Sequence, residues 1–245
     1  MNDIDKKGNW KICSFFVGEE RISCTIKGYK NAKKAFDRRF TEINKIMTDA
    51  KKMCRQGADI VNSINMEFKR SLWPRTESVI DGNDFEEDIY TKAYTSSTEY
   101  FKALFDVENQ TSGEWAPFVD ANIECLWGAG VDKAIPGKLT SDNVAWTILA
   151  GAKDAPSGGI PALVSRNVDT SMFPVSGNHD MYQRRDKVRL FDIPPFGTHG
   201  AVIVARDGAS WFIPARDGTI PLREIYEKLP SVKIPQGVKL KYLHP

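Results

Sequence analysis

The chain has 245 residues, of which 41% are hydrophobic and 27% charged, with only three histidines and four cysteines. A chain of this length can bury a core as one domain or two, and its apolar runs, such as residues 201–205, are far too short to cross a membrane. The cysteines form no Cys-x-x-Cys pair, which excludes the common zinc and thioredoxin motifs and favours reduced thiols. The polar first thirty residues predict no cleavable signal, hence a cytoplasmic protein or one exported by another route.

The charge is unevenly distributed about the dipeptide Trp73-Pro74. Residues 1–75 hold 17 Lys and Arg against 9 Asp and Glu, whereas residues 76–245 hold 17 against 23. We therefore expect a basic module over residues 1–75 and an acidic body over residues 76–245. The basic module is suited to a solvated helix face, to an acidic partner or to nucleic acid. The residue pattern does not support nucleic acid, since Phe36 and Phe40 belong to an apolar stripe rather than to a stacking surface.

The chain begins with a predicted β-hairpin. Residues 10–17 and 20–27 have strand patterns around Gly18-Glu19, a pair suited to a type II′ turn. Such a turn pairs residues whose numbers sum to 37, which places Cys13 opposite Cys24 on one apolar face. A cross-strand disulfide is conceivable there, and buried thiols are the preferred interpretation.

A long helix with an apolar seam is predicted from Asn31 to near Ser71. The seam alternates steps of four and three residues, which is typical of helix packing or an oligomer contact. Its members are Phe36, Phe40, Ile43, Met47, Ala50, Cys54, Gly57, Val61, Ile64 and Phe68. The small residues in mid-seam predict close approach of a neighbouring element, for which we expect the apolar face of the hairpin. The seam also predicts a protein partner or a homo-oligomer.

The remainder of the chain predicts a mixed body. A solvated acidic turn is expected at residues 81–88, a second helix over residues 88–107 and an irregular region after Gly113. Strands are expected at 187–193, 201–206, 210–215 and 219–220, with Asp207-Gly208 and Asp217-Gly218 as two turns of one antiparallel meander. A short helix follows over residues 221–229. The fold class is therefore α+β, with an N-terminal hairpin and long helix and an irregular C-terminal body closed by the meander.

The candidate catalytic pair is Cys125 and His199. A histidine at the start of a strand holds an imidazole rigidly, and a thiol nucleophile needs such a base near neutral pH. Cys125 is the only cysteine outside the hairpin and helix. Asp207, Asp217 or Ser210 is available to orient the imidazole. We predict a thiol hydrolase that requires no cofactor.

Residues 120–215 resemble papain-like peptidoglycan amidases of the CHAP and NlpC type. Residues 191–204 (FDIPPFGTHGAVIV) look like the family's G-D-I-x-x-F-x-x-x-x-H-V-A-I-V segment, and Trp146 has a loose counterpart. The resemblance implies Cys125 as nucleophile, His199 as base and a peptide or cell-wall amide as substrate. The Gly-Asp of the family is Phe191-Asp192 in this chain, and Cys125 follows no Asp or Gln of the usual cysteine motifs.

Two shorter resemblances point to phosphoester chemistry. Residues 177–180 (GNHD) resemble the Gly-Asn-His-Asp motif of metallophosphoesterases, which implies Asn178 and His179, beside Asp180, as metal ligands. The family's other ligand motifs are absent, and a polar turn is the simpler interpretation. Residues 126–130 (LWGAG) resemble a stretch of colicin M, a toxin that cleaves a lipid-linked peptidoglycan precursor.

Three classes of function therefore stay open. They are a thiol hydrolase at Cys125 and His199, a phosphoester-cleaving enzyme or colicin M-like toxin, and a non-enzymatic assembly or binding protein that uses the Phe36 to Phe68 seam. The substrate, the oligomeric state and the compartment do not follow from the residues.

Overall fold

The computed structural model describes residues 13–17, 20–24, 26–65, 72–77, 92–105, 121–134, 138–152, 160–173, 186–229 and 238–245, with side chains from residue 33 onward. The chain forms two compact units, Met1–Thr48 and Asp49–Pro245. The expected boundary at residue 75 followed the charge distribution, whereas the structural division falls within the long helix. Helices and antiparallel strands occur together, which confirms the α+β fold class. None of the described helices is long and apolar enough to span a membrane.

The first unit contains the predicted hairpin. Strands β1 (Cys13–Val17) and β2 (Glu20–Cys24) pair antiparallel, with Cys13 opposite Cys24 and Val17 opposite Glu20. This register confirms the pairing expected from a turn at residues 18 and 19. The thiols of Cys13 and Cys24 lie outside the described side chains, so the disulfide alternative stays a prediction.

The long helix α1 covers Ile26–Asn65 and belongs to both units. It begins five residues before the expected start, and the expected end near Ser71 lies outside the described residues. Along its second half the seam is buried, as Ala50, Val61 and Ile64 are each at most 1% exposed.

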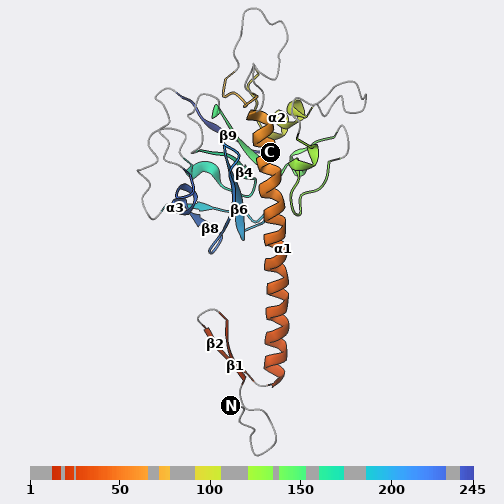
Figure 1. The fold of residues 1–245 in the computed structure, drawn as a ribbon, viewed down its shortest axis with the longest axis vertical. Coiled ribbons are helices and arrows are strands. Elements are labelled where there is room, and N and C mark those ends of the chain that lie inside the picture. The colour runs from red at the N-terminus through yellow and green to blue at the C-terminus, as the bar shows by residue number, and fades with distance from the viewer. Residues whose placement is uncertain are drawn as a thin grey trace, which may run out of the picture. The chain divides into compact units, whose positions relative to one another are not determined.

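The core of the second unit is a five-stranded antiparallel sheet in the order β7-β6-β4-β3-β9. The strands are β3 (Trp146–Ala150), β4 (Pro161–Ser165), β6 (Gly200–Ala205), β7 (Ser210–Pro214) and β9 (Lys241–Leu243), of which Figure 1 labels β4, β6 and β9. Every residue of β3, β4 and β6 is buried. These strands therefore lack the alternation of apolar and polar residues that marks a half-exposed strand.

The second half of α1 packs on this sheet through Gly57. A Cβ atom at Gly57 would lie only 2.7 Å from Val204 Cγ2 on β6 and 2.9 Å from Trp146 Cη2 on β3. On the same seam, the Cys54 side chain is hydrogen-bonded to the Ser210 side chain on β7. The small seam residues allow close approach, as predicted, and at Gly57 and Cys54 the element that approaches is this sheet, where the hairpin was expected.

The predicted meander divides between two sheets. The turn at Asp207-Gly208 joins β6 to β7 as expected. After Asp217, with φ of 50°, and Gly218, with φ of 68°, the chain leaves the large sheet, and β8 (Thr219–Pro221) pairs with β5 (Lys187–Arg189). The single-meander prediction is therefore wrong at its last strand. Helix α3 (Leu222–Tyr226) follows within the expected residues 221–229.

In the described part of the second unit, three short 3-10 turns and one further helix accompany the sheets. The turns are η1 (Ile123–Leu126), η2 (Ser141–Asn143) and η4 (Thr170–Met172). Helix α2 covers only Ser97–Leu104, although a helix from residue 88 was expected. The difference arises because Ser96 has extended backbone angles and caps the helix, which ends helical geometry on its N-terminal side.

Candidate functional site

The thiol of Cys125 is buried beneath the N-terminal end of β3. Cys125 lies in η1, where the Asn122 side-chain Oδ1 accepts a hydrogen bond from the Glu124 backbone N–H and so caps the turn. The Cys125 carbonyl accepts a 2.7 Å hydrogen bond from Trp146 Nε1, and the neighbouring Glu124 carbonyl accepts one from Gln56 Nε2 on α1. The residue is 8% exposed. These contacts explain the position of Cys125 as part of the packing of η1 against α1 and β3.

The electrostatic surroundings of Cys125 disfavour the thiolate. Burial, followed by the negative charges of Asp59 and Glu124, raises the pKa of the Cys125 thiol to about 11. A hydrogen bond to the Asn122 backbone and, after it, the positive charge of Lys52 are the smaller effects that lower the pKa. A reactive cysteine needs the reverse arrangement, a partly exposed thiol in an electropositive setting. Within the described residues, His199 is not among the groups that set this pKa.

His199 is exposed at the entry to β6, as the sequence predicts for a histidine that begins a strand. Its backbone N–H donates to the Phe196 carbonyl at 3.1 Å, and its carbonyl accepts from the Ala215 N–H at 2.9 Å. The backbone is thus held on both sides, and no described hydrogen bond or charge contact joins the imidazole to Cys125. The hydrolase assignment of the pair stays a prediction.

The two carboxylates expected to orient His199, those of Asp207 and Asp217, lie in turns. Asp207 Oδ1 accepts a 3.0 Å hydrogen bond from the Ala209 backbone N–H and closes the β6–β7 hairpin. Asp217 is exposed and occupies the left-handed region of the turn before β8. Ser210, the third option, is the residue that bonds to Cys54. None of these described contacts directs a group at His199.

The Gly-Asn-His-Asp motif falls outside the described residues, and with it Asn178, His179 and Asp180. Within the parts of the chain that the structure does describe, no group of three or more His, Cys, Asp or Glu side chains is arranged to hold a metal ion. The described residues therefore add no geometric support to the phosphoesterase hypothesis, which stays a prediction. Trp127, in the stretch that resembles colicin M, is buried.

The third histidine, His244, joins four segments of the chain and was not a candidate in the sequence. Its Nδ1 lies 3.2 Å from Thr147 Oγ1 on β3, and its Nε2 lies 3.0 Å from Thr170 Oγ1 in η4. Its carbonyl accepts a 2.8 Å hydrogen bond from the Ser97 N–H of α2. Burial lowers the pKa of the His244 imidazole, and the nearby carboxylate of Asp169 opposes that shift. His244, which follows β9, thus links β3, η4 and α2, and we call its contacts with Thr147, Thr170 and Ser97 the histidine clasp.

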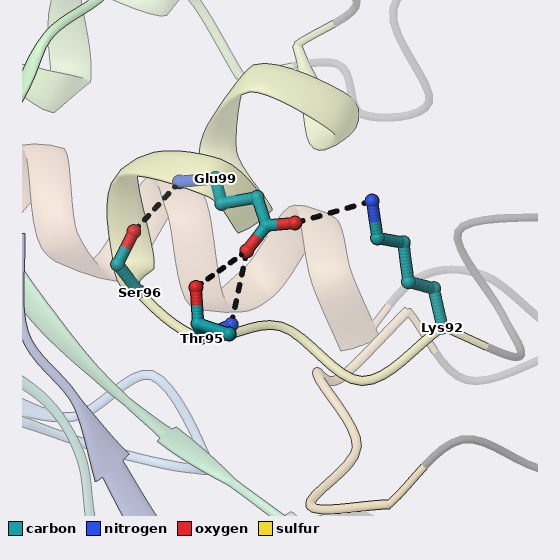
Figure 2. A network of polar contacts seen from close by, with 4 residues as sticks. All are labelled: Lys92, Thr95, Ser96 and Glu99. Carbon is teal, nitrogen blue, oxygen red and sulfur yellow. Dashed lines mark hydrogen bonds and ion pairs between the residues drawn. The ribbon is translucent and has the colours of Figure 1, made fainter.

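The first turn of α2, whose Ser97 N–H donates to the His244 carbonyl, is stabilised by its own capping contacts. Figure 2 shows Ser96 accepting a 3.1 Å hydrogen bond from the Glu99 N–H, while Glu99 Oε2 accepts from both the N–H and the hydroxyl of Thr95. Lys92 pairs with the other Glu99 oxygen at 3.1 Å. This reciprocal capping fixes the first turn, from which Ser97 also donates its hydroxyl to the Trp146 carbonyl.

Among the residues that the structure describes, the largest group of exposed apolar side chains lies between Phe36 and Met47 on α1. Phe36, Phe40, Ile43 and Met47 are 49%, 56%, 57% and 43% exposed, and we call these four residues the α1 stripe. The rings of Phe36 and Phe40 stack with centroids 6.1 Å apart. The stripe belongs to the same apolar seam as the buried residues farther along α1. The seam is therefore exposed at the stripe and largely buried from Ala50 to Ile64.

Comparisons with protein-family models, curated proteins and solved structures find no match to this chain. Functional conclusions therefore rest on the residues and their geometry. Of the features described, the buried thiol is poorly placed for chemistry, whereas the α1 stripe is an exposed surface with the spacing of a packing interface.

Proposed function

We propose that this chain is a non-enzymatic assembly protein that binds a protein partner through the α1 stripe. The observation that supports the proposal is the exposure of four large apolar side chains in register with a seam whose other half is buried. Exposed apolar groups of this kind mark protein interaction sites when they gather on one face. An isolated apolar residue would carry no such meaning.

The energy available from the stripe sets the strength of the association. Complete burial of a large apolar side chain contributes about 1.5–3 kcal/mol, so the exposed halves of four such side chains contribute about 3–6 kcal/mol. Association costs on the order of 4–15 kcal/mol in lost translational and rotational freedom. The stripe alone therefore supports weak, reversible binding, and a stable complex needs further contacts.

The stripe also carries charge that restricts the choice of partner. At about 100° per residue, Lys33 and Arg39 are exposed about 50–70° from the centre of the stripe, one on each side of it, with Asp37 beyond Lys33. The other exposed charges of this segment, Lys34, Arg38, Lys45 and Glu42, lie toward the opposite face of the helix. Two such stripes facing each other would bring like charges together, whereas an acidic partner surface would attract them. We expect the partner to combine apolar groups with carboxylates.

The test is a comparison of two double variants by size-exclusion chromatography with light scattering. Phe40→Gln with Ile43→Gln makes the stripe polar, and glutamine keeps the propensity of the helix. The control is Thr41→Gln with Thr48→Gln, two exposed positions off the seam whose hydroxyls bond only to α1 carbonyls. The stripe variant is expected to lose self-association or partner binding and the control to keep it. Equal binding by both variants would refute the proposal.

A further inference from the structure

A second exposed apolar surface lies in the acidic body of the molecule. Phe191 and Ile193, on either side of Asp192, are each 40% exposed in the segment between β5 and β6. Met172 in η4 is the remaining large apolar side chain exposed in the described part of the second unit. Exposure of a phenylalanine and an isoleucine two residues apart costs solvation free energy unless another surface covers them.

Arg166 holds this segment rigidly against two neighbouring loops. Its Nε donates to the Pro194 carbonyl at 2.9 Å, and one terminal nitrogen donates to the Ser141 and Asp142 carbonyls at 3.0 and 3.2 Å. The Asn143 side chain donates to the Asp132 carbonyl at 3.1 Å. We call residues 130–132, 141–144 and 191–194 the Arg166 loop cluster. Because its backbone is bonded on several sides, a partner would meet a preformed surface.

Asn167 fixes the far end of the same segment. Its side-chain nitrogen donates to the Gly197 carbonyl at 2.7 Å and to the Gly200 carbonyl at 2.9 Å, while its backbone carbonyl accepts from the Phe191 N–H at 2.8 Å. The side chain is fully buried. The side chain of Phe191 is thus exposed, while its backbone is fixed by hydrogen bonding.

The Arg166 loop cluster is edged by carboxylates. Asp132, Asp142 and Asp192 are all exposed, and they outnumber the two cations of the cluster and its edge, the Arg166 guanidinium, on which the charges of Asp142 and Asp132 act, and the exposed Lys133. The cluster thus pairs apolar side chains with negative charge. The α1 stripe pairs apolar side chains with positive charge. The two surfaces are complementary in both respects, which favours association and speeds encounter.

We propose that the partner of the α1 stripe is a second copy of this chain, and that the stripe docks on the Arg166 loop cluster of that copy. This inference rests on the proposed function and adds the identity of the partner. The two surfaces differ, so the contact is heterologous and leaves each copy with one free stripe and one free cluster. Copies joined in this way form a ring if the rotation closes and an open chain if it does not.

Two variants, each with one surface disabled, test the inference. Phe40→Gln with Ile43→Gln removes the stripe, and Phe191→Ser with Ile193→Ser removes the apolar part of the cluster. Each variant alone lacks one half of every contact and is expected to be monomeric in sedimentation velocity. An equimolar mixture is expected to form a one-to-one dimer that does not grow, because the intact stripe of one variant meets the intact cluster of the other.

Controls and outcomes separate this inference from the proposed function. Met172→Ser removes an exposed apolar side chain outside the cluster and is expected to assemble as the unmodified chain does, while circular dichroism verifies that each variant is folded. Assembly by the Phe191 and Ile193 variant alone, with loss only in the stripe variant, would overturn the inference and leave the proposed function intact. A mixture that stays monomeric would also overturn it. A monomeric unmodified chain would likewise overturn the inference but not the proposed function, which names a protein partner without requiring a second copy of this chain.

The charge match has its own test. Screening lengths fall from about 10 Å at 0.1 M salt to about 3 Å at 1 M, so attraction between exposed Arg and Asp side chains weakens over that range. Assembly of the unmodified chain is therefore expected to weaken as salt rises. Assembly that strengthens with salt would indicate contact by apolar groups alone and would refute a partner surface edged by carboxylates.

Discussion

Replacing Gly57 with alanine tests the packing of α1 on the sheet, because two effects of opposite sign compete there. In an exposed helix the change stabilises by about 0.8–1 kcal/mol through helix propensity. At Gly57 the new Cβ would lie 2.7 Å from Val204 Cγ2 and 2.9 Å from Trp146 Cη2, whereas carbon atoms pack at about 3.5–4.0 Å. Both neighbouring side chains are fully buried and have little room to move. Overpacking of this kind costs about 1–3 kcal/mol, so the packing term is the larger.

The expected net result is a loss of about 1 kcal/mol in the free energy of unfolding, measured by urea denaturation followed by circular dichroism. For a chain of this size the loss corresponds to a fall of about 2–4 °C in Tm. Val204→Ala removes one of the two clashing groups, so Gly57→Ala is expected to be less harmful in that background. A gain of about 1 kcal/mol from Gly57→Ala in the unmodified chain would show that α1 does not pack on β3 and β6, and would refute the reasoning.

Three further predictions concern the histidine clasp, the buried thiol and the cap of α2. Burial depresses the pKa of His244, so the unfolded chain binds its proton more readily; stability should fall as pH drops below about 6.5, and His244→Gln should flatten that dependence, whereas parallel pH profiles would contradict it. With a pKa of about 11, about one Cys125 thiol in a thousand is ionised at pH 8. Iodoacetamide labelling of Cys125, followed by mass spectrometry, should therefore be far slower in the native than in the denatured chain. Equal labelling rates would contradict the burial of the thiol. Ser96→Ala should cost about 1 kcal/mol and lower Tm by about 2–4 °C, and an unchanged Tm would show that the cap is unimportant.

Local patterns predicted the elements whose signals are local. The hairpin register followed from the turn at residues 18 and 19, and the seam of α1 followed from its period. The hairpin turn at Asp207-Gly208 also lies where its sequence places it. In each case the information is contained within a few residues or one helical repeat.

The sheet was harder to predict because its central strands have no alternation. β3 and β4 are short runs buried at every position, which periodicity cannot distinguish from other buried segments. β9 has three residues and pairs with β3 about ninety residues earlier in the chain, a contact no local pattern reveals. The same long-range pairing brings His244 to Thr147 and Thr170, so a histidine that no local motif singled out is the centre of a polar cluster.

The candidate chemistry was predicted from residue types, and residue types do not report burial. Cys125 was singled out because it stands apart from the other cysteines, yet its carbonyl bonds to Trp146 and its thiol is shielded by packing and by nearby carboxylates. The seam, in contrast, was predicted as a unit. Only the structure divides it into a buried half and the exposed α1 stripe, since that division depends on where the sheet ends.

The central claim is that the α1 stripe binds a second copy of the chain, and the most direct measurement is the weight-average mass of the unmodified protein over a wide concentration range. Sedimentation equilibrium from micromolar to near-millimolar concentration covers the weak affinity expected from about 3–6 kcal/mol of apolar burial assisted by charge. The account predicts a mass that rises steadily above the 27.5 kDa of one chain as concentration increases. A mass that stays at 27.5 kDa throughout would contradict it.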